Sequence, residues 1–315
     1  MKSRVAVVIP ALDDRDLLTK NLPLLLDEVE VRGMEDEVII VDDTGEDVLA
    51  SWVAEKFSGR VRVMVRETCG GFAKALNTGA RQGTAELLLC LNPDVRVRPG
   101  FLTPLVEAMQ DPEVHSVSPR VLLNGAANRA ETHQRMLVEG GRLVSQPLTP
   151  DPDCTDPVPI PFPLGGAMMV RREEFLAEGG FDPLLAPFYF EDTDLGLTAW
   201  RRGRKVLEIP VSVVEHHHRG TIGPLVPERI VRAAIERNRL LVHWKHLDSQ
   251  ATANDHYLAL YRDALDAGLG ERREELIWMA LALDDLEPAT HSRQQLGTMR
   301  RTLGEALVAA DPSRS

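Results

Sequence analysis

Residues 37–45 read EVIIVDDTG, an apolar and mostly β-branched run that stops at two aspartates. Such a run predicts a strand buried on both faces, as in a parallel sheet that is covered by helices. Similar short runs occur at residues 5–9, 61–65 and 87–91, and sequence of helical periodicity separates them. This alternation predicts an α/β fold with a Rossmann-like, mostly parallel sheet and flanking helices.

Polar residues close two of these strands. Asp42 and Asp43 end the stretch quoted above, and Asn92-Pro93-Asp94 ends the fourth strand. Open parallel sheets bind ligands at the carboxyl ends of their strands, so both groups are candidates for a binding site. A carboxylate there can accept hydrogen bonds from a nucleotide, and Asp94 could supply an oxygen ligand to Mg²⁺. Either group alone is equally typical of a turn or a helix cap.

Three aromatic residues precede three acids in the stretch FYFEDTD, residues 188–194. An apolar wall beside a carboxylate raises its pKa and favours a general base that acts near neutral pH. Acids that cap a helix are the alternative interpretation. His216, His217 and His218 follow another predicted strand, and they could supply a metal ligand. On the residues alone, metal binding is the less favoured interpretation of the three histidines.

The composition of the chain argues against several classes of protein. The 315 residues include 36 Lys and Arg against 48 Asp and Glu, a formal net charge of −12, which argues against nucleic acid as a partner. Three cysteines without a CxxC pair predict a reducing compartment and no disulfide framework. The N-terminal residues lack the apolar core of a signal peptide, and no apolar run is long enough for a membrane span. We expect a cytoplasmic protein.

The second half of the chain is less regular. Prolines recur from residue 147 to residue 163 and predict an extended segment, which in a compact domain is more often a functional loop or lid than filler. Basic and aromatic residues at 237–245 would suit peripheral contact with the inner face of a membrane, although packing is the simpler interpretation. We predict one domain over residues 1–245 and a helical extension over 246–315, which could pack on the core, form a homodimer or meet a partner.

Six stretches, taken in order, resemble the family 2 glycosyltransferases with a GT-A fold. They are VAVVIPALDD, EVIIVDDTGED, CGGFAKALNTGARQGTAELLLCLNPDV, GGAMMVRREEF, GGFDPLLAPFYFEDTDLGLTAWRRG and VVEHHHRGTIG. The resemblance covers roughly residues 4–245. It looks closest to bacterial members that build cell-surface polysaccharides, including the rhamnosyltransferase-like branch.

The resemblance implies a part for each motif. Asp192, with Glu191 beside it, corresponds to the catalytic base. Asp94 and His216, with His218 as the fallback, correspond to ligands of a divalent metal, Mg²⁺ or Mn²⁺, although Asn92 stands where many members have a first acid. The residues implied at the nucleotide-sugar donor are Pro10, Ala11, Asp13, Asp42, Asp43, Gly70, Gly71, Lys74, Asn92, Asp94 and Gly166.

The implied reaction is an inverting transfer of a sugar from a nucleotide-diphosphate sugar to a hydroxyl acceptor. That acceptor could be a saccharide, a lipid-linked molecule or another alcohol, and the cation would stabilise the departing diphosphate. A sugar-nucleotide nucleotidyltransferase is one alternative, but its glycine-rich loop is missing from residues 5–12. A non-catalytic nucleotide-sugar binding module is another, which Asn92 favours and Glu191-Asp192 opposes.

Overall fold

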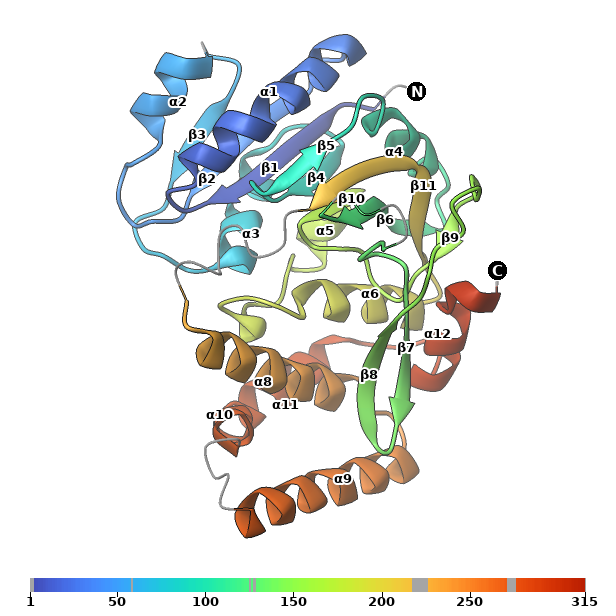
Figure 1. The fold of residues 1–315 in the computed structure, drawn as a ribbon. Helices are drawn as coiled ribbons and strands as arrows, with labels where there is room; N and C mark the ends of the chain where they lie inside the picture. The colour runs from blue at the N-terminus through green and yellow to red at the C-terminus, as the bar shows by residue number, and fades with distance from the viewer. Residues whose placement is uncertain are drawn as a thin grey trace.

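The computed structural model describes residues 3–57, 59–124, 126, 129–216, 226–270 and 276–314 (Figure 1). The strands are β1 (Val5–Ala11), β2 (Glu37–Asp42), β3 (Arg62–Val65), β4 (Leu87–Leu91), β5 (Val95–Val97), β6 (Val114–Leu123), β7 (Gln134–Glu139), β8 (Arg142–Pro147), β9 (Val158–Pro159), β10 (Ala167–Arg171) and β11 (Lys205–His216). The helices are α1 (Arg15–Arg32), α2 (Ala50–Phe57), α3 (Phe72–Gln82), α4 (Leu102–Ala108), α5 (Arg172–Ala177), α6 (Glu191–Arg201), α8 (Glu228–His246), α9 (Gln250–Leu269), α10 (Ile277–Asp284), α11 (Leu286–Gln295) and α12 (Leu303–Ala309), with 3-10 turns η1 (Pro183–Leu185) and η3 (Pro312–Arg314).

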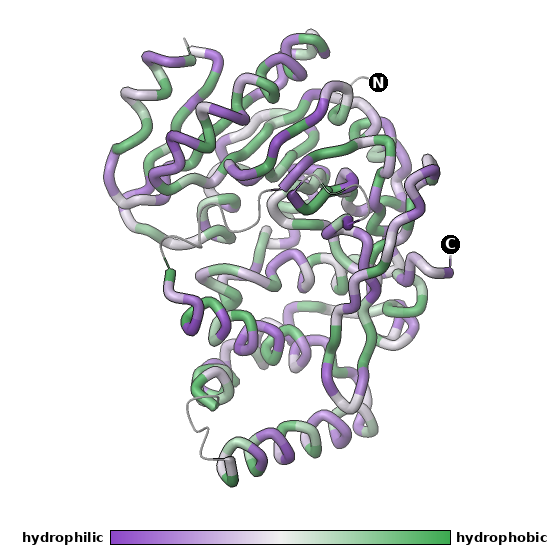
Figure 2. The backbone as a smooth tube through the Cα atoms, in the orientation of Figure 1, coloured by the Kyte–Doolittle hydropathy of each residue, from purple (hydrophilic) through white to green (hydrophobic). Residues whose placement is uncertain are grey.

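A nine-stranded sheet lies at the centre, in the order β3-β2-β1-β4-β10-β6-β11-β5, with β9 also beside β11. Strands β1, β2, β3, β4, β6 and β11 point the same way, whereas β10, β5 and β9 run against them. The apolar strands are green in Figure 2, as expected for strands that are covered on both faces. The predicted α/β fold is confirmed.

Helices cover the two faces of the sheet because alternate strand residues point in opposite directions. Val7 and Ile40 belong to the core under α1, α2 and α4, whereas Val8 and Ile39 pack against α3 and α5. The Cβ position of Gly79 on α3 is within 2.9 Å of a Val41 methyl group, so a larger residue would push this helix off the sheet. The sheet edge is therefore held rigidly from both sides.

The reversed strand β10 decides where the site can form. Its first residue, Ala167, pairs with Leu91, the last residue of β4. Gly165 and Gly166, which precede β10, therefore lie at the same edge as the carboxyl ends of β1, β2 and β4. Residues far apart in the chain meet along this one edge.

The C-terminal helices form a second cluster on the side of α6 away from the parallel strands (Figure 1). Helices α10 and α11 pack on α8, and α12 packs on α6. The outermost helix, α9, meets the tip of the β7–β8 hairpin, where Asp263 pairs with Arg142. The predicted helical extension is confirmed. The division into two domains at residues 245 and 246 falls at the end of α8 and stays a prediction.

The apolar positions of α8 mostly pack inside the protein. Val231, Leu240 and Leu241 are buried, and so is Lys245, while Ile230 is exposed. This supports packing over membrane contact for the buried residues. None of the described helices is both long and apolar enough to cross a lipid bilayer. The proline-rich segment runs beside β11 through β9 and then under α6, where the Ile160 carbonyl accepts a hydrogen bond from Trp200 Nε1 at 2.8 Å.

Candidate active site

Asp42 and Asp43, side by side at the end of β2, bind different partners. The Asp42 carboxylate is fully buried and accepts hydrogen bonds from the Thr44 hydroxyl at 2.6 Å and from the Thr44, Val48 and Leu49 amides at 3.1 Å each. All of these donors belong to the loop that follows β2. Asp42 therefore shapes that loop, and this geometry lends no support to its predicted contact with a nucleotide.

Asp43 joins β2 to the glycine pair before α3. Its carboxylate accepts hydrogen bonds from the Gly70 amide at 3.1 Å and from the Gly71 amide at 2.7 Å. The Arg66 guanidinium forms a close ion pair with the same group. Gly71 has φ +81°, which favours glycine, and a Cβ there would collide with the Pro187 carbonyl. Gly71 is thus needed for this close approach of the backbone to Pro187.

Asn92 and Asp94 follow β4 and face two other elements. The backbone amide of Asn92 donates to the Gly166 carbonyl at 2.8 Å. A Cβ on Gly166 would collide with the Asn92 side chain. Asp94 is buried, and its Oδ1 lies 3.4 Å from Nε2 of His216 at the end of β11. Nδ1 of His216 lies 2.8 Å from a Glu131 carboxylate oxygen. The predicted pair of metal ligands, Asp94 and His216, does come together.

The two carboxylates around His216 govern its charge. Burial favours the neutral ring, but hydrogen bonds and charge interactions with Asp94 and Glu131 outweigh it and raise the pKa of His216 to about 10. The ring is therefore protonated at neutral pH, and a cation at Nε2 would have to displace that proton.

The donor set fits a hard divalent cation only in part. The described residues include no group of three or more His, Cys, Asp or Glu side chains arranged to hold a metal. Mg²⁺, however, usually takes one or two carboxylates and completes its shell with phosphate oxygens. Asp94 and His216 would suffice if a diphosphate supplied the rest, and Glu131 would orient the histidine as a second-layer carboxylate commonly does.

Asp192 lies in the first turn of α6 and is partly buried. Its Oδ2 accepts a hydrogen bond from the Gly165 amide at 2.9 Å, and its Oδ1 accepts one from the Thr193 amide at 2.6 Å. Burial is the largest influence and raises the pKa of Asp192, although both amides oppose the rise. A carboxylate with a raised pKa is a better proton acceptor, which suits a general base.

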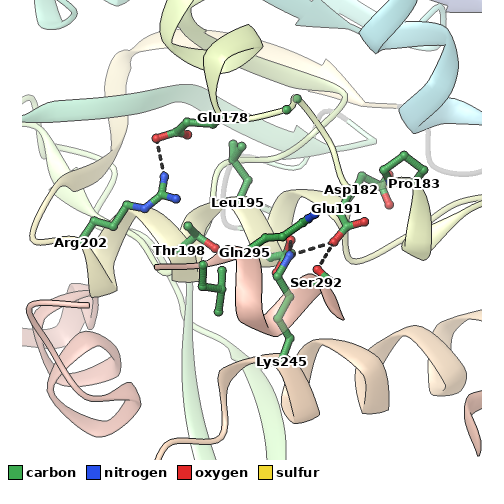
Figure 3. Close-up of a pocket in the computed structure, with 14 residues that line it drawn as sticks. Glu178, Asp182, Pro183, Glu191, Leu195, Thr198, Arg202, Lys245, Ser292 and Gln295 are labelled. Carbon is green, nitrogen blue, oxygen red and sulfur yellow. Dashed lines mark hydrogen bonds and ion pairs between the residues drawn. The ribbon is translucent and has the colours of Figure 1, made fainter. Parts of the chain in front are cut away.

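Glu191, the first residue of α6, lies at a cavity that Asp192 does not line. It lines this cavity of about 140 Å³ together with Asp182, Asp194, Lys245 and Ser292 (Figure 3). Glu191 Oε2 has no hydrogen-bond partner among the described residues. Burial, and then the charge of Asp192, raise the pKa of Glu191 to about 8. Asp43, Asp94 and Asp192 do not line this cavity, so it is separate from the sheet edge.

A chain of contacts nonetheless connects the three predicted carboxylates. Asp43 binds the amide of Gly71, and the next amide, of Phe72, donates to the Pro187 carbonyl at 3.1 Å. The Phe72 ring is 3.3 Å from the Cβ position of Gly165, which in turn holds Asp192. Gly166 then meets Asn92, two residues before Asp94. The residues predicted at the site thus follow one another along a single edge of the sheet.

The remaining residues that the resemblance implies at the site take little part in these contacts. Pro10 and Ala11 are buried at the end of β1, where the Ala11 carbonyl accepts the Asp43 amide at 2.9 Å. The exposed Asp13 pairs with Arg15 at 2.6 Å, and that pair lowers the pKa of Asp13. Lys74 is exposed on α3. His218 lies outside the described residues.

Sequence reasoning missed several residues that build the site, namely Arg66, Phe72, Glu131, Pro187 and Asn238. Glu131 is 85 residues from His216, in a stretch without clear periodicity, so nothing in the sequence connects the two. Asn238 sits within the apolar pattern of α8, and only its polarity at a buried position distinguishes it.

Comparison with known proteins bears on the family and the fold. The profile of the family described as Glycosyl transferase family 2 matches residues 6–176, which is more than half of the chain. Among curated proteins, N-acetylgalactosaminyltransferase 6 of Drosophila melanogaster is 29% identical over 199 residues, 58% of this chain and 29% of that protein. The probable polypeptide N-acetylgalactosaminyltransferase 8 of Homo sapiens is 27% identical over 227 residues, 65% of this chain and 34% of that protein. The chain therefore spans only a minor part of these relatives' length.

Solved structures share the fold. GalNAc-T7 with UDP, GalNAc and Mn²⁺ aligns with a TM-score of 0.61 and 21% identity, over 76% of this chain and 47% of that one. The mannosyltransferase PcManGT from Pyrobaculum calidifontis, in complex with GDP-Man and Mn²⁺, aligns with a TM-score of 0.56 and 18% identity, over 98% of this chain and 86% of that one. Together with the sheet-edge site, the match to the family profile leads to one conclusion: this chain belongs to glycosyl transferase family 2.

Proposed function

We propose that the protein is an inverting glycosyltransferase, which moves a sugar from a nucleotide-diphosphate sugar to an acceptor hydroxyl. The observation that carries this proposal is the run of contacts that links Asp43, Asp192 and Asp94 along one sheet edge. A base for the acceptor hydroxyl, and ligands for a cation that stabilises the leaving group, suit a single displacement at a sugar carbon. Membership of the family supports the same reaction class.

Asp192 acts as the general base in this proposal. Its raised pKa suits it to take the proton from the acceptor hydroxyl as the oxygen attacks the anomeric carbon. The Gly165 and Thr193 amides each donate to a different carboxylate oxygen and fix its orientation. Fixed geometry of this kind supplies much of the advantage of an enzyme, because it replaces a random encounter.

Asp94 and His216 would hold the divalent cation, Mg²⁺ or Mn²⁺. The bound ion supplies a Lewis acid for the negative charge that grows on the departing diphosphate. Asp43 and the Gly70–Gly71 pair form the side of the site toward the nucleotide, with Pro10 and Ala11 beneath them. The acidic surroundings would repel a diphosphate without a cation, since the chain is acidic overall.

The identities of the donor and the acceptor are further parts of the proposal. Two solved structures of the same fold contain UDP or GDP-Man, so uridine and guanosine diphosphate sugars are the first donors to test. The resemblance to the rhamnosyltransferase-like branch adds dTDP sugars to the panel. We place the reaction in the cytoplasm, in the synthesis of a polysaccharide or glycoconjugate on a saccharide or lipid-linked acceptor. Peripheral membrane contact and a homodimer remain part of that proposal.

Release of nucleoside diphosphate from a panel of sugar nucleotides, with and without Mn²⁺, tests the proposal. We expect Asp192→Asn to lower kcat by about 10²- to 10⁴-fold, the usual contribution of a general base, while donor affinity stays unchanged. Asp266→Asn, at an exposed aspartate on α9, is the matched control and should behave as wild type. Donor binding without turnover, across donors and acceptors, would instead favour a binding module, in keeping with Asn92 in place of an acid.

A further inference from the structure

The loop before α6 adopts an uncommon backbone shape. Tyr189 and Phe190 have φ values of 73° and 74°, a left-handed conformation that residues with a Cβ seldom adopt, and here two bulky residues adopt it in succession. Glu191 and Asp192 follow immediately. Conformations of this kind persist only where the surrounding structure enforces them, and they gather at functional sites.

Asn238 of α8 provides that enforcement. Its side chain is completely buried, and its amide nitrogen donates to the carbonyls of Leu185 at 2.7 Å, Tyr189 at 2.9 Å and Phe188 at 3.0 Å. The two N–H donors of one side-chain amide are thus shared among three carbonyl oxygens of a single loop. Buried carbonyls need donors, so loss of this group would leave them unsatisfied and free the loop to move.

Arg237, the preceding residue, reinforces the same contact. Its guanidinium donates to the carbonyls of Leu184 at 3.2 Å and Ala186 at 3.3 Å, and to Oδ1 of Asn238 at 2.5 Å. Asp285, just before α11, holds the guanidinium in place through an ion pair of 2.5 Å. Two adjacent side chains of α8 therefore hold the loop, and Asp285 before α11 holds one of them.

The loop is connected in turn to the base. The Phe190 carbonyl accepts the amide of Asp194 in the first turn of α6, and the Pro187 carbonyl accepts the amide of Phe72 at the start of α3. Asp192 itself is held by the Gly165 amide at 2.9 Å. A shift of the loop would therefore carry the Asp192 carboxylate away from Gly165 and loosen the contact with α3.

We propose that Asn238 is a positioning residue for Asp192, acting through the loop of residues 185–190. This inference rests on the proposed function for its catalytic consequence, but the positioning itself is a property of the fold. The side chain is suited to the task because it combines donors for the carbonyls with an acceptor for Arg237. An aspartate of equal size would set a carboxylate oxygen against three carbonyl oxygens.

The test compares Asn238→Ala and Asn238→Asp with the control Asn254→Ala, which alters an exposed asparagine on α9. Hydrogen exchange of the Phe72 and Gly165 amides reports the loop and the base directly, without any substrate. We expect both amides to exchange at least about tenfold faster in the two Asn238 variants, as local opening predicts, while amides of β1 exchange as in wild type.

Kinetics of nucleoside diphosphate release form the second measurement. We expect kcat to fall by about 10- to 100-fold, the range expected when a catalytic group is displaced by about an ångström, with the donor KM within about twofold of wild type. Unchanged exchange at Phe72 and Gly165 in a folded variant would overturn the proposal, and so would a raised donor KM with normal kcat. If wild type released no diphosphate from any donor, the proposed function would fail, whereas the exchange result would still decide the part of Asn238.

Arg237→Lys covers the case in which both Asn238 variants fail to fold. Lysine keeps the positive charge but loses the fork that reaches two carbonyls and Asp285 at once. Faster exchange at the same two amides, in a folded protein, is the expected result. Wild-type exchange in this variant would contradict the proposal.

Discussion

At the scale of single residues, the two adjacent aspartates at the end of β2 show how little the residue type alone reveals. Asp42 satisfies four donors of its own loop, while Asp43 reaches the glycines before α3, 27 and 28 residues away. Successive residues of a strand point to opposite sides, which separates the two carboxylates. The pair that resembles one motif therefore divides into a residue that shapes its own loop and a residue that joins β2 to the start of α3 at the candidate site.

Glu131 offers a residue-scale test of the metal site. Its carboxylate lies 2.8 Å from Nδ1 of His216, so it would act on a cation through the orientation of the ring. We expect Glu131→Gln to weaken Mn²⁺ binding, measured calorimetrically with UDP present, by about 10- to 100-fold. Glu139→Gln, at an exposed glutamate on β7, is the control. Equal Mn²⁺ affinity in both variants would remove Glu131, and with it the orienting role, from the site.

The raised pKa of Glu191 predicts how the free energy of unfolding depends on pH. Its pKa in the folded protein is raised to about 8, because burial and the charge of Asp192 disfavour the carboxylate. The folded state therefore binds more protons than the unfolded state between the ordinary pKa of about 4.5 and about 8, and the free energy of unfolding falls as pH rises through that window.

Glu191→Gln lacks this ionisation. The variant should gain stability relative to wild type as pH is raised from about 5 to about 9, as measured by urea unfolding. Glu55→Gln, at an exposed position on α2, should show no such trend. Parallel pH profiles for Glu191→Gln and wild type would mean that Glu191 is solvated like an ordinary glutamate.

At the scale of elements, the apolar runs were sufficient to predict β1, β2, β3 and β4 and the helices between them, but β6 was not predicted. The residues of β1, β2 and β4 are almost continuously apolar, because helices cover both faces. The reversal of β10 and the pairing of β9 with β11 could not be read in the same way. A buried strand has the same composition in either direction, and its partners are decided by contacts distant in the chain.

Two helical glycines give a matched test of packing at this scale. In α6, a Cβ on Gly196 would stand 2.6 Å from the Pro161 carbonyl and would also strike Phe162, whereas a Cβ on Gly268 of α9 would meet nothing within 4 Å. We expect Gly196→Ala to lower the free energy of unfolding by about 1–3 kcal/mol, the usual effect of overpacking. Gly268→Ala should raise it by up to about 1 kcal/mol, because alanine favours a helix. Chemical denaturation of the two variants measures both changes in the free energy of unfolding. A Gly196→Ala variant more stable than wild type would show that α6 can move off the proline-rich segment.

At the scale of the whole molecule, the C-terminal helices are tied to the helix that carries the base. Asp194 of α6 accepts hydrogen bonds from Lys245 at 2.7 Å and His246 at 2.9 Å, both at the end of α8. Arg201, at the other end of α6, pairs with Asp248 at 3.1 Å. The charge of Lys245 and the other contacts outweigh burial and lower the pKa of Asp194, so this buried carboxylate stays ionised.

A chain that ends at Lys245 tests whether residues 1–245 form an independent domain. Truncation removes Asp248 and the apolar residues of α12 that pack on Trp200. We expect the free energy of unfolding to drop by more than about 3 kcal/mol, because single large core losses already cost 2–5 kcal/mol. Urea unfolding of both lengths provides the measurement. An unchanged midpoint would support the division into two domains that the sequence predicts.

The candidate site was predictable in outline and not in detail. Strand ends point to Asp43 and Asp94, and the aromatic stretch before Asp192 indicates a desolvated base, because these signals are local. The residues that hold these groups in place, Glu131 and Asn238, lie 85 and about 50 residues from their partners. Contacts of that range leave no periodic trace, so only the folded arrangement reveals them.

The reversed strand β10 also limits which changes of length the chain can tolerate. Ala167 and Met169 face one core while Met168 and Val170 face the other, so inserting or deleting one residue here would exchange the two sets. The same slip would draw Gly166 off Asn92. Natural variation in length should therefore be absent from this short strand and concentrated at solvent-facing turns, such as the one at Gly33 between α1 and β2.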